Sequence, residues 1–187
     1  MMGEVNKKNV LTLHNKISSP NTATLLLVGA EGLGKHKFAL SIMSQKAPFS
    51  LQIRTATSLP LPPDHDNTRP NIDYVIFILD LTNRMSISNV EASVKTLDCE
   101  YFLGRSCCVV LQANNPSLHG ADIKNITGLC DAYHMPMFCA SFDEEKDRKC
   151  ISQKVLSMLQ VACGTRKGVS PMLIDATRRS FAFEETL

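Results

Sequence analysis

The chain has 187 residues, and at roughly 150 residues per domain this length corresponds to one domain with a short added segment. Hydrophobic residues make up 44% of the chain and charged residues 20%, a composition that excludes collagen-like and wholly disordered proteins. Twenty Lys and Arg against 18 Asp and Glu leave a net charge of +2, which is too little to hold nucleic acid through net charge alone.

Residues 1–20 are polar and charged, and we expect them to form a flexible N-terminal extension. No apolar run approaches the roughly 20 residues that a membrane-spanning helix needs, so we expect neither membrane insertion nor a secretion signal. The seven cysteines are an odd number without a CxxC pair, and most lie in apolar runs, which indicates buried thiols in a reducing compartment. Neither they nor the five histidines have the paired spacing of a zinc site, so we expect no metal ion.

The first predicted elements are a strand, a glycine-containing loop and a helix. An apolar run at 24–28 stops at the glycine cluster 29–34, and from Lys35 onwards apolar residues recur at helical spacing. Residues 51–56 could form a second strand. The segment 58–70 contains four prolines and few apolar side chains, which predicts a loop.

The middle of the chain predicts the centre of a sheet. Residues 73–79 are a nearly continuous run of β-branched and aromatic side chains, typical of a strand covered on both faces in a parallel sheet. A long amphipathic helix is predicted next, capped by Asn83 or Ser86 and ending before Gly104. Its buried stripe consists of apolar residues three or four positions apart: Ile87, Val90, Val94, Leu97 and Tyr101.

The rest of the chain continues the alternation of strands and helices. The same criteria predict strands at 107–112 and 137–139 and helices within 123–133 and 151–162. This alternation predicts an α/β fold with a doubly wound, mostly parallel sheet, in a domain that spans residues 21–164. Residues 165–187 are predicted to form a short added C-terminal helix, for which Pro171 suits the first position, and a disordered tail.

Gly29, Gly34 and Lys35 match the pattern G-x-x-x-x-G-K between a predicted strand and a predicted helix, which is the context of a phosphate-binding loop. In such a loop, backbone N–H groups surround phosphate oxygens and the lysine reaches the outer phosphates. The next position normally holds a Ser or Thr that coordinates Mg²⁺. Here it is His36, and imidazole is a poor ligand for that ion. Two interpretations remain: a nucleotide-binding loop, or a tight turn that needs glycines for backbone reasons, with His36 on the apolar face of the helix.

Other parts of a nucleotide site are weak or missing. The segment 46–73 contains no D-x-x-G and is too short for two strands, a helix and their connections. Asp64 and Asp66 lie in the predicted loop, where we expect them to be solvated. Asp80, at the end of the central strand, is the alternative metal-binding acid, but the residues after it suit a strand-to-helix turn equally well.

The glycine loop and the order of the elements resemble the small GTPase fold, whose fourth strand resembles residues 76–83 here. In such GTPases the next strand ends in N-K-x-D, and this chain has Asn115 and Ser117 in place of the Lys and the Asp. The later S-A-K motif corresponds to residues 139–141, of which Ala140 alone agrees. The resemblance implies a GTPase-like fold with a shortened switch region and without recognition of a guanine base.

Several stretches, taken in order, resemble the centromere protein M family over about residues 21–172. They are 21–29, 58–62, 69–70 with 72–73, and 101–104. This resemblance implies a non-catalytic, GTPase-like subunit of the inner kinetochore, within the constitutive centromere-associated network, that binds centromere protein I and assembles with centromere proteins H and K. It also implies a nuclear location at the centromere, a role in chromosome segregation, and DNA contact only through the complex.

The same resemblance implies that no nucleotide or other cofactor binds and that Gly29, Gly34 and Lys35 are a vestigial phosphate loop. The alternative is a divergent P-loop nucleotide-binding protein or GTPase switch. For that alternative, Lys35→Ala should remove nucleotide affinity and function. For a structural subunit, we expect the substitution to be nearly silent.

Two runs of large apolar residues are candidates for a partner surface. Tyr101, Phe102 and Leu103 end a predicted helix, and one buried stripe cannot hide all three, although a turn could fold Phe102 or Leu103 back into the core. Met172 and Leu173 lie in the added C-terminal helix, which could instead pack on its own domain. We expect Leu103 and Met172 to contribute to the surface, so Leu103→Asp and Met172→Asp should abolish complex formation.

Overall fold

A computed structural model of the chain describes residues 11–12, 21–62, 69–113, 123–166 and 168. The described strands are β1 (Thr22–Val28), β2 (Ser50–Ala56), β3 (Tyr74–Asp80), β4 (Ser106–Leu111) and β5 (Met137–Ala140). All of them pair in parallel, in the spatial order β2-β1-β3-β4-β5. Each strand overlaps one predicted from the sequence.

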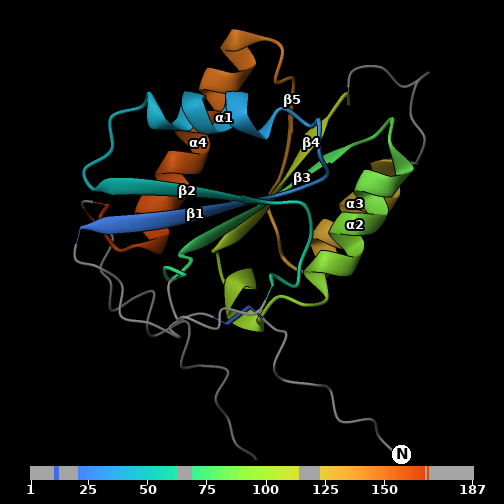
Figure 1. Cartoon of the computed structure of the whole chain (residues 1–187), viewed down its shortest axis with the longest axis horizontal. Coiled ribbons are helices and arrows are strands. Elements are labelled where there is room, and N and C mark those ends of the chain that lie inside the picture. Colours follow the sequence, from blue (N-terminus) through green and yellow to red (C-terminus); the bar gives the residue numbers. More distant parts are fainter. Residues whose placement is uncertain (1–10, 13–20, 63–68, 114–122, 167, 169–187) are drawn as a thin grey trace, which may run out of the picture.

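Helices flank the sheet on both faces, which confirms the predicted α/β class (Figure 1). The helices are α1 (Lys35–Met43), α2 (Arg84–Val94), α3 (Ile123–Ala132) and α4 (Glu145–Ala162), and a 3₁₀ helix, η2, spans Cys99–Phe102. In Figure 1, α1 and α4 lie over one face of the sheet and α2 and α3 over the other. None of the helices in the described part of the chain has the length and apolar character needed to span a membrane.

Strand β3 is the central strand, as its sequence predicts, and it is buried from Tyr74 to Leu79. Its side chains alternate between the two faces of the sheet. Phe77 and Leu79 belong to the hydrophobic cluster beneath α2 and α3, whereas Ile76 and Ile78 belong to the cluster beneath α1 and α4. A strand covered on both faces has no polar side, which explains the nearly continuous apolar run.

Helix α2 starts where one of the two predicted caps places it. The side-chain oxygen of Asn83 accepts hydrogen bonds from the N–H groups of Met85 and Ser86, at 3.0 and 3.4 Å. These bonds satisfy two of the N–H groups that have no partner within the first turn of a helix. Ser86 is buried inside the helix and is therefore not the cap.

The predicted helix across 87–101 is wrong in its second half, because α2 ends at Val94. The N–H groups of Thr96 and Leu97 bond to carbonyls three residues back, at 3.0 and 3.2 Å, which tightens the chain into a turn. The carboxylate of Asp98 then accepts from the N–H of Glu100 at 3.0 Å and starts η2. The apolar residues after the turn keep helical spacing, so periodicity alone does not reveal the break.

The predicted N-terminal extension, residues 1–20, contacts the domain at Leu11. Leu11 forms an isolated parallel bridge with Leu97 and packs against the cluster beneath α2 and α3. Its N–H donates to the carbonyl of Thr96 at 3.3 Å, and its carbonyl accepts from the N–H of Asp98 at 3.1 Å. Residues 1–10 and 13–20, like most of 165–187, lie outside the described residues.

Candidate functional site

The glycine loop joins the end of β1 to the start of α1, as the sequence predicts. At its beginning, the N–H of Gly29 donates to the carbonyl of Ala56 at 3.1 Å. A Cβ at Gly29 would lie 2.5 Å from the carbonyl oxygen of Ile78 on the neighbouring strand β3. Real Cβ atoms do not come this close to an atom to which they are not bonded. Any residue larger than glycine would push β1 and β3 apart here. The packing of the two strands therefore requires glycine at position 29, whether or not a ligand binds.

Gly34 sits immediately before α1 in the left-handed conformation, with φ of 73°. L-residues with a side chain are strained there, whereas glycine is not. A Cβ at this position would also meet the ring of Phe142 at 3.4 Å. The helix begins without a side-chain cap, and the carbonyl of Gly34 accepts from the N–H of Phe38 at 3.1 Å.

Lys35 is held by the protein itself. Its ammonium donates one hydrogen bond to the carbonyl of Gly29 and another, at 2.9 Å, to the carbonyl of Ala56. The side chain therefore curls back over the loop and ties the end of β1 to the end of β2. Partial burial lowers the pKa of Lys35 from its ordinary value, and the nearby carboxylate of Glu31 opposes that shift.

This geometry argues against the expectation that Lys35→Ala is nearly silent in a structural subunit. Removing the ammonium would leave the carbonyls of Gly29 and Ala56 without that donor, and Gly29 is buried. A buried acceptor that loses its partner costs about 1–3 kcal/mol. Loss of stability in a Lys35 variant is therefore expected whether or not a nucleotide binds.

His36 and Asp80 do not form a metal site with the loop. His36 is exposed on α1, so the alternative that placed it on the apolar face is wrong. The carboxylate of Asp80 accepts from both the N–H and the hydroxyl of Thr82, at 2.8 and 2.7 Å, and so stabilises the turn that leads into α2. Among the described residues, no group of three His, Cys, Asp or Glu side chains is placed to hold a metal ion.

Most positions that correspond to base-recognition and switch motifs lie outside the described residues: Asp64, Asp66, Asn115 and Ser117. The exception is the segment after β5. There the N–H of Ser141 donates to the carboxylate of Asp147, in the first turn of α4, at 3.3 Å. This contact stabilises the entry to α4 from within the chain.

The structure corrects one member of the predicted partner surface. Tyr101 is fully buried, and its hydroxyl donates to the carbonyl of Ile72 at 2.9 Å. Its ring packs in the hydrophobic cluster beneath α2 and α3, and its hydroxyl has the hydrogen-bond partner that a buried tyrosine needs. The expectation that Tyr101 lies on a surface is therefore wrong.

Phe102 and Leu103 lie nearer the surface than Tyr101. Phe102 is half-buried and packs on Tyr133, with ring centroids 4.9 Å apart at 44°, so it does turn towards the core. Leu103 ends η2, is also half-buried, and belongs to neither hydrophobic cluster of the described residues. Met172 and Leu173 lie outside the described residues.

Sequence reasoning missed an apolar surface on α1. Leu40 and Met43 are 68% and 58% exposed, while Phe38 and Ile42 of the same helix are fully buried. For Leu40 the signal was present in the sequence, because Leu40 lies two residues from both Phe38 and Ile42 and therefore on the opposite side of the helix. Met43 has the helical spacing of the apolar run that contains Phe38 and Ile42, so its exposure was not predicted.

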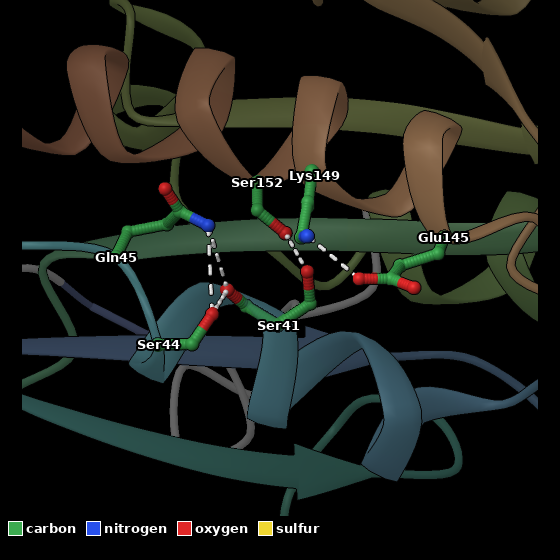
Figure 2. A network of polar contacts seen from close by, with 6 residues as sticks. All are labelled: Ser41, Ser44, Gln45, Glu145, Lys149 and Ser152. Carbon is green, nitrogen blue, oxygen red and sulfur yellow. Dashed lines mark hydrogen bonds and ion pairs between the residues drawn. The ribbon is translucent and has the colours of Figure 1, made fainter.

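Helix α1 is fixed against α4 by packing and by polar contacts (Figure 2). The hydroxyl of Ser152 on α4 donates to that of Ser41 on α1 at 3.0 Å. Phe142, just before α4, stacks on Phe38 of α1 with ring centroids 4.6 Å apart at 20°. The exposed side of α1 is therefore presented by a firmly held helix.

Comparison with known proteins identifies the family of this chain. The family described as Centromere protein M (CENP-M) matches residues 8–181. Centromere protein M of Xenopus laevis is 31% identical over 162 residues, which cover 87% of this chain and 90% of the relative. The Homo sapiens protein of the same name is 30% identical over 172 residues, covering 92% and 94%, and the Danio rerio protein is 31% identical over 155 residues, covering 83% of each. The chain therefore belongs to the centromere protein M family.

Proposed function

We propose that the chain is a non-catalytic structural subunit of the inner kinetochore, a pseudo-GTPase located at the centromere in the nucleus. It binds and stabilises centromere protein I in an assembly with centromere proteins H and K, and it is needed for kinetochore assembly and chromosome segregation. Membership of a family of centromere proteins supports the location. The engagement of Lys35 by the chain's own carbonyls is the observation that supports the absence of catalysis.

Phosphoryl transfer depends on positioned charge: a lysine directed at the phosphates, a hydroxyl and a carboxylate on the metal, and a residue that orients water. Here the ammonium of Lys35 bonds to Gly29 and Ala56, and His36 stands where the hydroxyl should be. The carboxylate of Asp80 accepts hydrogen bonds from Thr82. The lysine and the carboxylate therefore have structural tasks, and the metal-binding hydroxyl is replaced by an imidazole.

A nucleotide-binding switch is the second candidate, and the retained Gly29, Gly34 and Lys35 favour it. Thermal unfolding of the purified chain with and without about 1 mM GTP or ATP and Mg²⁺ separates the two. A micromolar site would add about 4 kcal/mol at that concentration, a rise in Tm of about 8 to 16 °C for a domain of this size. We expect no such rise. A rise of this size that Lys35→Ala removes would establish the switch.

The partner-binding part of the proposal is tested at Leu103. Leu103→Asp should abolish capture of centromere protein I, because it places a carboxylate in an apolar contact without changing a core cluster. Met85→Asp is the matched control, since Met85 is a 67% exposed apolar residue in the first turn of α2, at the opposite end of the sheet. Equal capture by the wild type and both variants would exclude Leu103 from the partner surface.

A further inference from the structure

Strand β2 is the edge of the sheet and pairs only with β1 among the described strands. The N–H of Ser50 donates to Asn21 at 2.7 Å, and the carbonyl of Ala56 accepts from Gly29 at 3.1 Å. In a parallel ladder, alternate residues direct both backbone groups to the same neighbour. The residues between those that face β1 therefore direct their N–H and carbonyl groups outward: Leu51, Ile53 and Thr55.

The face of β2 beneath α1 is apolar. Leu51 and Ile53 are half-exposed and pack against the cluster that contains Phe38 of α1. The same helix carries the exposed side chains of Leu40 and Met43. An added strand would therefore find unpaired backbone groups along its length and an apolar surface on one of its faces.

The opposite face of β2 is polar and positively charged. Gln52 and Arg54 are exposed there, and within the described part of the chain Arg54 forms no ion pair. If a second copy paired with β2 antiparallel about Ile53, the two Arg54 side chains would be diagonal neighbours and would repel each other. Charged residues on an edge strand oppose self-association in this way, which favours a different protein over a second copy of this chain as the occupant.

We propose that the edge of β2 receives an extended segment of a partner protein as a sixth strand. Such a segment has apolar side chains at alternate positions, which face Leu51, Ile53 and α1, and an acidic side chain between them, which faces Arg54. Main-chain hydrogen bonds supply affinity and the alternating side chains supply specificity in this mode of recognition. The inference rests on the proposed function, since the segment belongs to a subunit of the same centromere assembly.

The variant Thr55→Pro tests the edge. Thr55 is exposed and its N–H points outward, so proline removes a donor from the edge without removing one from the ladder with β1. We expect Thr55→Pro to bind the complex of centromere proteins H, I and K roughly tenfold or more weakly than the wild type. Thr55→Ala, which keeps the N–H, should bind as the wild type does.

Arg54→Glu tests the charge without a proline, in case Thr55→Pro does not fold. This variant should bind the complex more weakly than the wild type. Its affinity should also rise less than that of the wild type when the salt concentration is lowered. Hydrogen exchange of the wild type gives a direct measurement: the amides of Leu51, Ile53 and Thr55 should exchange freely in the isolated chain and become protected in the assembly.

The outcomes separate this inference from the proposed function. If the wild type does not bind the complex of H, I and K, the proposed function is wrong and the inference with it. If the wild type binds while Arg54→Glu binds equally well and the three amides stay unprotected, the edge inference alone is overturned. Self-association of the wild type that Thr55→Pro abolishes would make a second copy the occupant and would also overturn it.

Discussion

At the scale of single residues, the retained parts of the phosphate-loop pattern have structural tasks. Gly29 allows β1 to approach β3, and the ammonium of Lys35 ties together the ends of β1 and β2. Asp80 stabilises the turn before α2 through Thr82. These residues would be kept in a protein that binds no nucleotide, because their partners are parts of its own backbone and loops.

Lys35→Met should lower the free energy of unfolding by about 1–3 kcal/mol, since it keeps the aliphatic stem but leaves the carbonyls of Gly29 and Ala56 without the ammonium. Lys37→Met is the control. Within the part of the chain that the structure describes, the polar contact of Lys37 is an exposed ion pair with Asp143 at 3.2 Å, and such pairs contribute about 0–1 kcal/mol. Urea unfolding of both variants measures the difference, and equal destabilisation would show that the Lys35 contacts do not stabilise the loop.

The buried thiol of Cys107 should make the folded protein less stable at alkaline pH. Burial raises the pKa of its thiol from 9.0 to about 12, although a hydrogen bond with Tyr74 opposes the shift. Above pH 9 the unfolded thiol loses its proton while the folded thiol keeps it, so Cys107 stabilises the fold below pH 9 and this contribution falls as the pH rises towards 12. The decrease is about 1.4 kcal/mol per pH unit in that window.

Urea unfolding at pH 8 and pH 10 in a reducing buffer tests this expectation. Between these two values the wild type should lose about 1.4 kcal/mol more stability than Cys107→Ala. Cys150→Ala should behave as the wild type, because Cys150 is exposed on α4. If Cys107→Ala showed the same alkaline loss as the wild type, the thiol of Cys107 would not be its source.

At the scale of elements, polar side chains decide where the helices begin and end. Asn83 starts α2, and Asp98 starts the separate 3₁₀ helix η2 after a turn at Thr96 and Leu97. That turn moves Tyr101 to a position where its hydroxyl meets Ile72. A continuous helix would have carried Tyr101 onward along the axis of α2, so the break determines which of the three neighbouring apolar residues is buried.

Asn83→Ala should lower the free energy of unfolding by about 1 kcal/mol, because the N–H groups of Met85 and Ser86 lose the oxygen that accepts their hydrogen bonds. Asn83→Asp keeps an oxygen at the same place and should retain the stability of the wild type. Thermal unfolding of the two variants checks the role of the cap. Equal losses in both would point to another role for Asn83.

At the scale of the whole molecule, the glycine loop depends on the packing of α1 against α4. The ring of Phe142 lies where a Cβ at Gly34 would touch it, and it stacks on Phe38. Ser41 of α1 and Ser152 of α4 are joined by a hydrogen bond (Figure 2). The same contacts hold α1, whose buried residues Phe38 and Ile42 belong to the cluster against which Leu51 and Ile53 of β2 pack. The loop, helix α1 and the proposed strand-binding edge are therefore connected by packing, so a change in one should affect the position of the others.

Phe142→Ala should cost about 3–5 kcal/mol, the range for removing a buried aromatic ring, since Phe142 is 5% exposed. Phe138→Ala is the control, because Phe138 is only half-buried on β5, beneath the ammonium of Lys154. Denaturant unfolding gives both values. A cost at Phe142 no greater than at Phe138 would show that the loop and α1 do not depend on this stacking.

Local sequence patterns predict the order of strands and helices, the central position of β3 and the glycine turn before α1, and the structure agrees with each of them. These features depend on residues that are close in the chain: an unbroken apolar run for β3, and glycines at the sharp approach and left-handed turn of the loop. The α2 cap at Asn83 was equally local, although the sequence left Ser86 as an alternative.

The contacts of Lys35 and Tyr101 and the edge position of β2 depend on how distant parts of the chain pack. Lys35 meets Ala56 and Tyr101 meets Ile72 across 21 and 29 residues of chain, and no local pattern specifies such contacts. The outward backbone groups of β2 exist because, among the described strands, β1 alone pairs with β2 and lies on one side of it. Periodicity reports which side chains are apolar, whereas the partner of a polar group depends on how distant segments pack together.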